Sequence, residues 1–243
     1  MGRRGSVFGA RYPYETLPYG YEATRAGSLI GKVMLLLTFS FLVACVGTFV
    51  GASIFTANPG AGVATYFGAL IGGLVVLLIL NFTVQVRGLN LLLLYVFTFL
   101  EGVALAPILL YYVGTGQGNI LGEAFLITAV MSLSLSVYAW TTKRDFSRLG
   151  DYLFFGLILL LITGIVGIFF RGLFTTGILG SVISLIGIAI FSGYVLFYVQ
   201  RARYLADTLP NAIMLTVGIF ITVMNLFLYI LQLLSILSGN RRS

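Results

Sequence analysis

Seven long apolar runs follow one another along this chain, and each is long enough to cross a lipid bilayer as a helix. About 20 mostly apolar residues span the hydrocarbon core in helical form. Lipid offers the backbone no hydrogen-bond partners, so each run is predicted to be a helix. The sequence therefore predicts an all-α, polytopic membrane protein with seven transmembrane helices: Val33–Thr56, Ala61–Val84, Leu91–Val113, Ile120–Trp140, Tyr152–Phe169, Gly177–Gln200 and Asn211–Gly239.

The composition excludes a water-soluble globule. Of 243 residues, 59% are hydrophobic and 9% are charged, whereas about a quarter of a soluble domain is charged. We expect three parts: a polar, aromatic tail over residues 1–32, a membrane domain over 33–239 and a short tail over 240–243.

Several kinds of chemistry lack the residues they need. The chain has no histidine and one cysteine, Cys45, so His-ligated metal sites, Ser-His-Asp triads and disulfides are excluded. No HExxH, GxSxG, Walker A or CxxC motif is present. We therefore expect neither an enzyme, nor a metal site, nor a cofactor. Cys45 is expected to be a small buried apolar side chain.

The net charge of +7 reflects topology rather than nucleic-acid binding. The basic residues are spread thinly over the connections, so no continuous basic face exists to follow phosphates. Five basic residues lie in the N-terminal tail and six in the second, fourth and sixth connections, against three on the other side of the membrane. The positive-inside rule then predicts a cytoplasmic N-terminus and an external C-terminus.

The N-terminal tail interleaves four tyrosines with two prolines, which disfavour a helix there. One interpretation is a tail that lies at the lipid headgroups, where tyrosine is common. The other is a docking strip for a partner protein. The tyrosines that would make either contact are Tyr12, Tyr14, Tyr19 and Tyr21.

Glu101 is the acidic residue that falls deepest in a predicted span. It lies near the middle of Leu91–Val113, six residues before Pro107. Charge at membrane depth costs about 2.5–3.5 kcal/mol on insertion scales and often marks a functional site. Pro107 would kink the helix and expose carbonyls that a cation or water could use. Glu101 is therefore either an ion or proton site or a protonated carboxyl hydrogen-bonded to a neighbouring helix.

Two amides lie well inside the last apolar run. Asn225 falls midway along it and Gln232 two turns later. Side-chain amides inside a membrane commonly join neighbouring helices, so both residues are predicted to form interhelical hydrogen bonds.

Four segments resemble the Bax inhibitor family, also called the transmembrane Bax inhibitor motif proteins. TFLEGVALAPILLYY at 98–112 is similar to its third helix, and KRDFSRLGDYLFFGL at 143–157 to its connection between helices four and five. IFSGYVLFYVQ and MNLFLYILQLL, at 190–200 and 224–234, are similar to its last two helices. The resemblance implies a seven-helix bundle whose last helix is central. It also implies the bacterial branch, which is linked to calcium leak and to membrane-bound proteolytic quality control.

The chain departs from the family at its pH-sensitive latch. In calcium-leak members, the resemblance implies a pair of aspartates in the last two helices, at the positions of Tyr198 and Thr222. The basic partner of that pair would fall on Val84, three residues before Arg87. Two acids that share a site hold a proton between them and respond to pH. Tyrosine and threonine do not do so near neutral pH.

Two functions follow as hypotheses. The first is a non-catalytic membrane protein that acts through other integral membrane proteins, either by modulating an ATP-dependent membrane protease complex or as a subunit of a larger complex. The alternative is a pH-modulated calcium or cation leak channel, which the altered latch disfavours. The expected location is a bacterial inner (plasma) membrane, and nucleic acid is not an expected partner.

Overall fold

The computed structural model describes residues 23–170 and 176–239. Tyr12, Tyr14, Tyr19 and Tyr21, and with them the predicted docking strip, lie outside the described residues. Within that part of the chain the protein consists of seven helices joined by short connections. They are α1 (Ala23–Ala57), α2 (Pro59–Thr83), α3 (Leu89–Gly114), α4 (Gly118–Thr141), α5 (Leu149–Phe169), α6 (Gly177–Ala202) and α7 (Leu209–Gly239).

The predicted all-α fold with seven spans is confirmed, because all seven helices are long and apolar enough to cross a membrane. The largest difference is at the start of α1, which begins ten residues before the predicted Val33. Hydropathy marks only the part of a helix that lies in lipid, and a helix can continue beyond it into water. The turn before α2 follows its sequence signal, since the Asn58 side chain accepts a hydrogen bond from the Ala61 N–H and Pro59 opens the helix.

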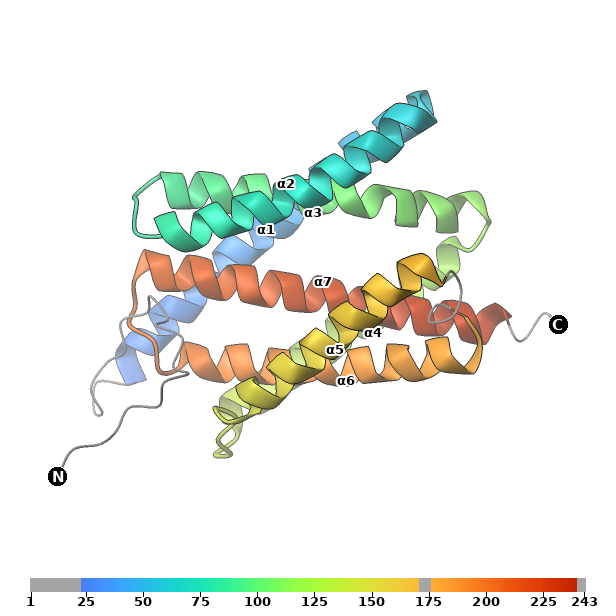
Figure 1. The fold of residues 1–243 in the computed structure, drawn as a ribbon. Coiled ribbons are helices and arrows are strands. Elements are labelled where there is room, and N and C mark those ends of the chain that lie inside the picture. Colours follow the sequence, from blue (N-terminus) through green and yellow to red (C-terminus); the bar gives the residue numbers. More distant parts are fainter. Residues whose placement is uncertain (1–22, 171–175, 240–243) are drawn as a thin grey trace.

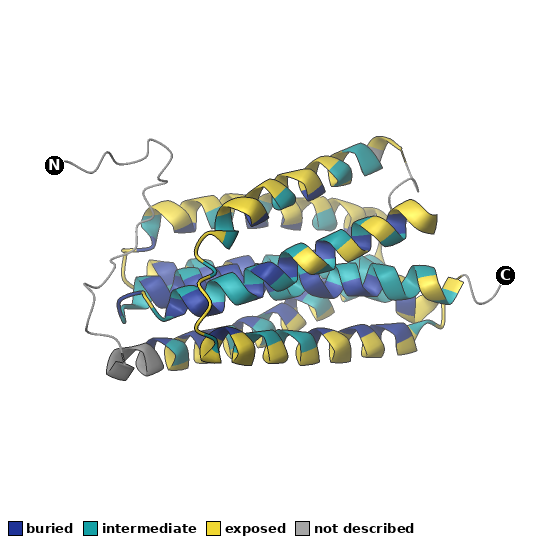
Figure 2. Cartoon of the chain, turned by 90° about the horizontal axis from the view of Figure 1, so that it is seen from below, coloured by how far each residue is buried: buried dark blue, intermediate teal, exposed yellow. Residues whose placement is uncertain are grey.

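The last helix is central, as the family resemblance implies. In Figure 1, α7 lies between a group formed by α1, α2 and α3 and a group formed by α4, α5 and α6. It packs against α1 and α3 of the first group and against α4 and α6 of the second. Within its span, 56% of α7 is buried, against 11% for the peripheral α5. Figure 2 shows the same gradient, with buried residues in the middle of the bundle and exposed ones on its outer helices.

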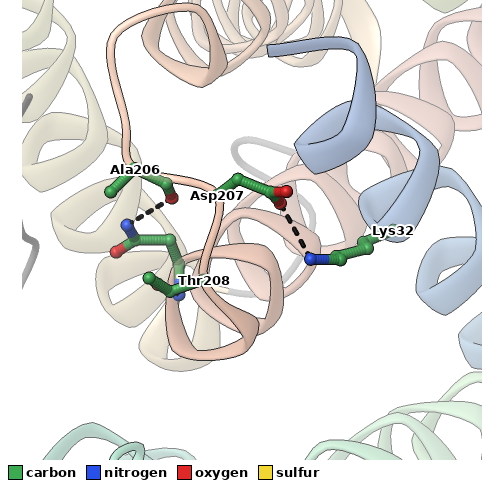
Figure 3. Close-up of polar contacts among 5 residues, drawn as sticks. Lys32, Ala206, Asp207 and Thr208 are labelled. Carbon is green, nitrogen blue, oxygen red and sulfur yellow. Dashed lines mark hydrogen bonds and ion pairs between the residues drawn. The ribbon is translucent and has the colours of Figure 1, made fainter. Parts of the chain in front are cut away.

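Alternating helix directions place all the described lysines and arginines on one side of the bundle. We call this side the basic face; it contains the starts of α1, α3, α5 and α7 and the ends of α2, α4 and α6. The opposite face contains the other helix ends, including the end of α7. On the basic face, the Lys32 Nζ of α1 lies 2.9 Å from Asp207 Oδ1 in the connection between α6 and α7 (Figure 3). Buried Asn211 holds the same connection, since its Nδ2 donates to the Ala206 carbonyl at 2.8 Å.

Small residues bring α1 and α3 into backbone contact. Gly47 and Gly51 are four apart on α1, and Gly102 and Ala106 are four apart on α3. A Cβ at Gly47 would collide with the Phe99 carbonyl, and one at Gly102 with the Ala44 carbonyl. Such spacing of small residues lets membrane helices pack by van der Waals contact.

A hydrogen bond adds to this crossing. The Thr48 hydroxyl donates to the Gly102 carbonyl of α3 at 2.9 Å, and it also lies 3.0 Å from the Ala44 carbonyl of its own helix. The first three-helix group is therefore fixed by a contact that leaves no room for a side chain at Gly102.

The crossing of α1 and α3 predicts that a glycine-to-alanine change, which usually stabilises a helix, destabilises this protein at Gly102. Glycine to alanine inside a helix ordinarily gains about 0.5–1 kcal/mol. At Gly102 the added methyl would meet Ala44 backbone atoms and separate the helices, at a cost of about 1–3 kcal/mol. We expect Gly102→Ala to lower the melting temperature of the purified protein by several degrees. Gly68→Ala on α2, where a Cβ meets nothing within 4 Å, should leave it equal or raise it. Equal melting temperatures for the two variants would contradict the packing described.

Candidate functional site

Tyr198 of α6 and Thr222 of α7 meet at Gly218. The Tyr198 ring lies flat against this glycine, because a Cβ there would be 2.6 Å from two ring carbons. The Thr222 hydroxyl donates to the Gly218 carbonyl at 2.7 Å, and Thr222 is 2% exposed. One glycine thus receives a ring from the neighbouring helix and a hydroxyl from its own.

Tyr198 belongs to a row of aromatic rings between α6 and α7. Tyr194 stacks on it with ring centroids 5.9 Å apart, and Phe191 lies 6.1 Å from Tyr194. Tyr229 of α7 stacks on Phe191 at 5.8 Å, with its own ring over Gly187 of α6. Offset and tilted ring pairs of this kind contribute about 0.5–1.5 kcal/mol each beyond area burial. Glycine on each helix faces a tyrosine from the other, so the two helices interlock at two depths.

Val84 lies in the same apolar cluster as Tyr198. It is 2% exposed and packs in the core that α1, α3 and α7 share at the basic face. Its carbonyl accepts a hydrogen bond from the buried Asn90 amide at 2.8 Å. Arg87, three residues on, is exposed. The structure therefore places an apolar side chain at position 84, in the cluster against which Tyr198 packs.

Glu101 lies half-buried where α2 meets α3. Its Oε1 is 3.4 Å from the position that a Cβ would take on Gly73 of α2. Within residues 23–170 and 176–239 its carboxyl group forms no hydrogen bond and no ion pair. The neighbouring glycine leaves space beside the carboxyl that a larger residue would fill.

The depth of Glu101 follows from a ring contact between α3 and α7, which run in the same direction. Phe97 lies edge-on to Phe220 with ring centroids 6.1 Å apart. Glu101 is one turn beyond Phe97 and Met224 one turn beyond Phe220, each a rise of about 6 Å. Glu101 therefore lies at the depth of Thr222 and Asn225, near the middle of both helices.

Pro107 frees a carbonyl, but α1 covers it. Proline has no N–H, so the Val103 carbonyl four residues earlier loses its helical partner. Val103 is 4% exposed, and its oxygen lies 2.9 Å from the position of a Cβ on Gly51. Helix α3 continues through Pro107 to Gly114. The carbonyl that the proline frees thus faces a glycine of α1 rather than water.

The two amides of α7 that were expected to join helices have different surroundings. The Asn225 Nδ2 donates to the Ile221 carbonyl of its own helix at 2.9 Å, where we expected a bond to a neighbouring helix. A short side chain reaches the carbonyl four residues back more easily than one on another helix. Gln232 lines a cleft of roughly 300 Å³ between α3 and α7.

On the outer surface of α1, one residue differs from the sequence-based prediction. Cys45, expected to be buried, is exposed. A small apolar side chain gains as much from lipid contact as from a protein interior, so burial is not enforced in a membrane. Elsewhere in the described residues, no three histidine, cysteine or acidic side chains gather where they could hold a metal ion.

A comparison with protein-family models decides the classification. The model described as "Inhibitor of apoptosis-promoting Bax1", of the Bax inhibitor family, matches residues 27–239. The chain belongs to the Bax inhibitor family. This membership confirms the resemblance that the sequences of the third, sixth and seventh spans indicate.

Relatives of this Bax inhibitor family protein occur in bacteria, plants and a virus. An uncharacterised membrane protein of Vibrio cholerae is 33% identical over 60% of this chain, and the match spans 63% of the relative's length. The protein LIFEGUARD 3 of Arabidopsis thaliana is 30% identical over 96% of this chain and 90% of its own. A Golgi anti-apoptotic protein of vaccinia virus is 30% identical over 79% and 73%, respectively.

Sequence reasoning missed the role of Gln200, the last residue of a motif that the Bax inhibitor family resemblance includes. This side chain is 4% exposed. Its Oε1 accepts from the Phe146 N–H and its Nε2 donates to the Arg144 carbonyl. Gln200 thereby fastens the connection between α4 and α5 to the end of α6. The available signal was a polar residue at the end of an apolar run.

Two further contacts order this connection. The Arg203 guanidinium lies 5.7 Å from the centre of the Trp140 ring and donates to the Trp140 and Thr142 carbonyls at the end of α4. The Ser147 N–H and hydroxyl donate to the Asp145 carboxylate, and these bonds hold the pKa of Asp145 below its ordinary value.

The Gln200 contacts predict how fast a protease cuts this connection. Gln200→Leu keeps the volume but leaves the Phe146 N–H and Arg144 carbonyl unpaired, and each unpaired group costs about 1–3 kcal/mol. We expect trypsin to cleave after Lys143 and Arg144 several times faster in the variant. Gln85→Leu, at an exposed glutamine on the same face, serves as the control and should match the wild type. Equal cleavage rates in all three proteins would exclude the role of Gln200.

Proposed function

We propose that this protein is a non-catalytic member of the Bax inhibitor family that acts through contacts with other integral membrane proteins. In this role it modulates a membrane-bound, ATP-dependent protease complex in quality control or is a subunit of a larger membrane complex. In this role the protein acts through the shape of its membrane-embedded surface and catalyses no reaction.

The packing at Gly218 is the observation that supports this proposal. Tyr198 and Thr222 occupy the two positions where calcium-leak members of the family are expected to have aspartates, and Val84 occupies that of their basic partner. Here a ring, a hydroxyl bonded to its own helix and an apolar side chain fill those places. None of these groups changes charge near neutral pH. A bundle centre with this chemistry favours a constant shape, which suits a binding partner better than a gated pore.

The proposal predicts that gentle solubilisation recovers the protein with partners. The tail before Val33, with its four tyrosines, is the proposed contact, since tyrosine supplies large contact area at interfaces. Removing residues 1–22, which leaves all described helices intact, should release partners that co-purify with the full chain. The comparison is a pull-down in mild detergent, followed by mass spectrometry of bound proteins. A full-length protein that is monomeric and free of partners, with or without the tail, would overturn the proposal.

The proposed location is a bacterial inner membrane, with the basic face toward the cytoplasm. Relatives in bacteria support the membrane, and the positive-inside rule supports the direction. The N-terminal tail would then meet cytoplasmic or membrane-embedded partners on the side where the connection held by Gln200 also lies.

A second candidate function, a calcium or cation leak, draws support from Glu101. Its carboxyl lies at mid-depth, beside a glycine and without a protein partner among the described residues. An unpaired carboxyl in lipid is costly, and a passing cation would offset that cost. The burial of the Val103 carbonyl against α1 argues the other way, because it removes an oxygen that could share the ion.

Flux measurements decide between the two. If the protein conducts through Glu101, reconstituted vesicles should take up calcium, and Glu101→Gln, which removes the charge and keeps the shape, should reduce the rate at least tenfold. Glu123→Gln, at an exposed position near the start of α4, is the matched control. Absence of flux, or equal flux in the wild type and Glu101→Gln, would sink the leak function.

A further inference from the structure

The cleft between α3 and α7 is apart from both the Gly218 packing and Glu101. It has a volume of roughly 300 Å³, at the lower end of the range for ligand sites in proteins. Two residues of α3 and four of α7 line it: Ile108, Tyr112, Leu228, Leu231, Gln232 and Ser235. None of the six is charged.

Tyr112 gives the cleft a hydrogen-bonding group. Only 8% of this residue is exposed, and its ring packs in the core formed with α4 and α7. Its hydroxyl forms no hydrogen bond within the described residues. It is not one of the fully buried polar atoms that lack a partner, so it is accessible from the cleft that Tyr112 lines. The Tyr112 hydroxyl is therefore placed to donate a hydrogen bond to a molecule that occupies the cleft.

The polarity of the lining changes with depth. Tyr112 and Ser235 lie near the ends of α3 and α7, about 3 and 6 Å from the last residue of each helix. Leu228 lies two turns deeper than Ser235, roughly 10 Å into the membrane. The cleft therefore offers hydroxyls at the level of the opposite face and aliphatic side chains below them.

We propose that this cleft binds a bilayer phospholipid from the leaflet at the opposite face, through its acyl chain and ester carbonyl. The carbonyl would accept a hydrogen bond from the Tyr112 hydroxyl, while the chain lies against Ile108 and Leu228. The absence of charge in the lining favours the uncharged ester region over the phosphate, which remains among the headgroups. The bound lipid fills the space between α3 and α7 and joins the two three-helix groups on this side.

Photochemical labelling tests the site in the full-length protein. Vesicles of phosphatidylethanolamine and phosphatidylglycerol would contain a trace of phosphatidylcholine with a diazirine in its acyl chain. After illumination, mass spectrometry of peptides should find the label concentrated in residues 105–112 and 228–235. Label spread evenly over all lipid-facing helices would overturn the proposal.

A filled cleft provides the matched comparison. Ile108→Trp should reduce labelling of these two segments at least fivefold. Leu126→Trp makes a similar increase in size on α4, where the leucine is 66% exposed, and should leave the labelling unchanged. Equal labelling in the two variants, or displacement of the label by a co-purifying membrane protein, would show that a lipid is not the occupant.

The hydroxyl has a separate test that does not require a larger side chain. Tyr112→Phe keeps the ring in its core and removes only the donor. We expect native mass spectrometry to find severalfold less phospholipid retained on this variant, with an unchanged helix content by circular dichroism. Tyr111→Phe, which alters an exposed neighbour, is the control. Retention that is equal in both variants would contradict the proposed hydrogen bond.

Discussion

Close backbone approach at glycine is the constraint on which this bundle depends. Lipid tails are as apolar as leucine, so burial of apolar surface does not drive membrane helices together. Shape and van der Waals contact must do so. At Gly47 and Gly102, a backbone carbonyl of the partner helix occupies the space that a side chain would need. At Gly187 and Gly218, a tyrosine ring from the partner helix lies against the glycine. At the central helix α7, the Tyr198 ring of α6 reaches the backbone in this way at Gly218.

This packing bears directly on function, because it occupies the place where the family's aspartate pair is expected. Paired carboxyls form a contact whose strength changes with each proton. The contact of Tyr198 with Gly218 is made of dispersion and ring stacking, which do not depend on pH in the neutral range. We propose that the position expected to be a switch in calcium-leak members is a fixed joint in this protein.

Much of the fold could be predicted from the sequence, since hydropathy and the lack of backbone partners in lipid leave few alternatives. The spans, their number and the turn at Asn58 and Pro59 followed from local signals. The central place of α7 did not, because all seven runs are similarly apolar; it came from the family resemblance. The exposure of Cys45 could not be predicted either, since an apolar residue is equally suited to lipid and protein.

The site was predicted less completely than the fold. Glu101 was evident as a charge at mid-depth, and Tyr198 and Thr222 were evident against the family pattern. That Glu101 and Thr222 lie within a few ångströms of the same depth depends on the contact between Phe97 and Phe220. The partners of Gln200 lie 54 and 56 residues away, and no local periodicity points to them. The cleft beside Tyr112 forms between two helices, so the sequence of neither helix alone predicts it.

We propose that packing at Gly218, rather than an acid pair, closes the middle of this protein. Calcium flux into vesicles at pH 6 and pH 8 tests this proposal, for the wild type and for the double variant Tyr198→Asp, Thr222→Asp. We expect the same flux at both pH values for the wild type and pH-dependent flux for the double variant. A wild type whose flux itself changes severalfold between the two pH values would contradict it.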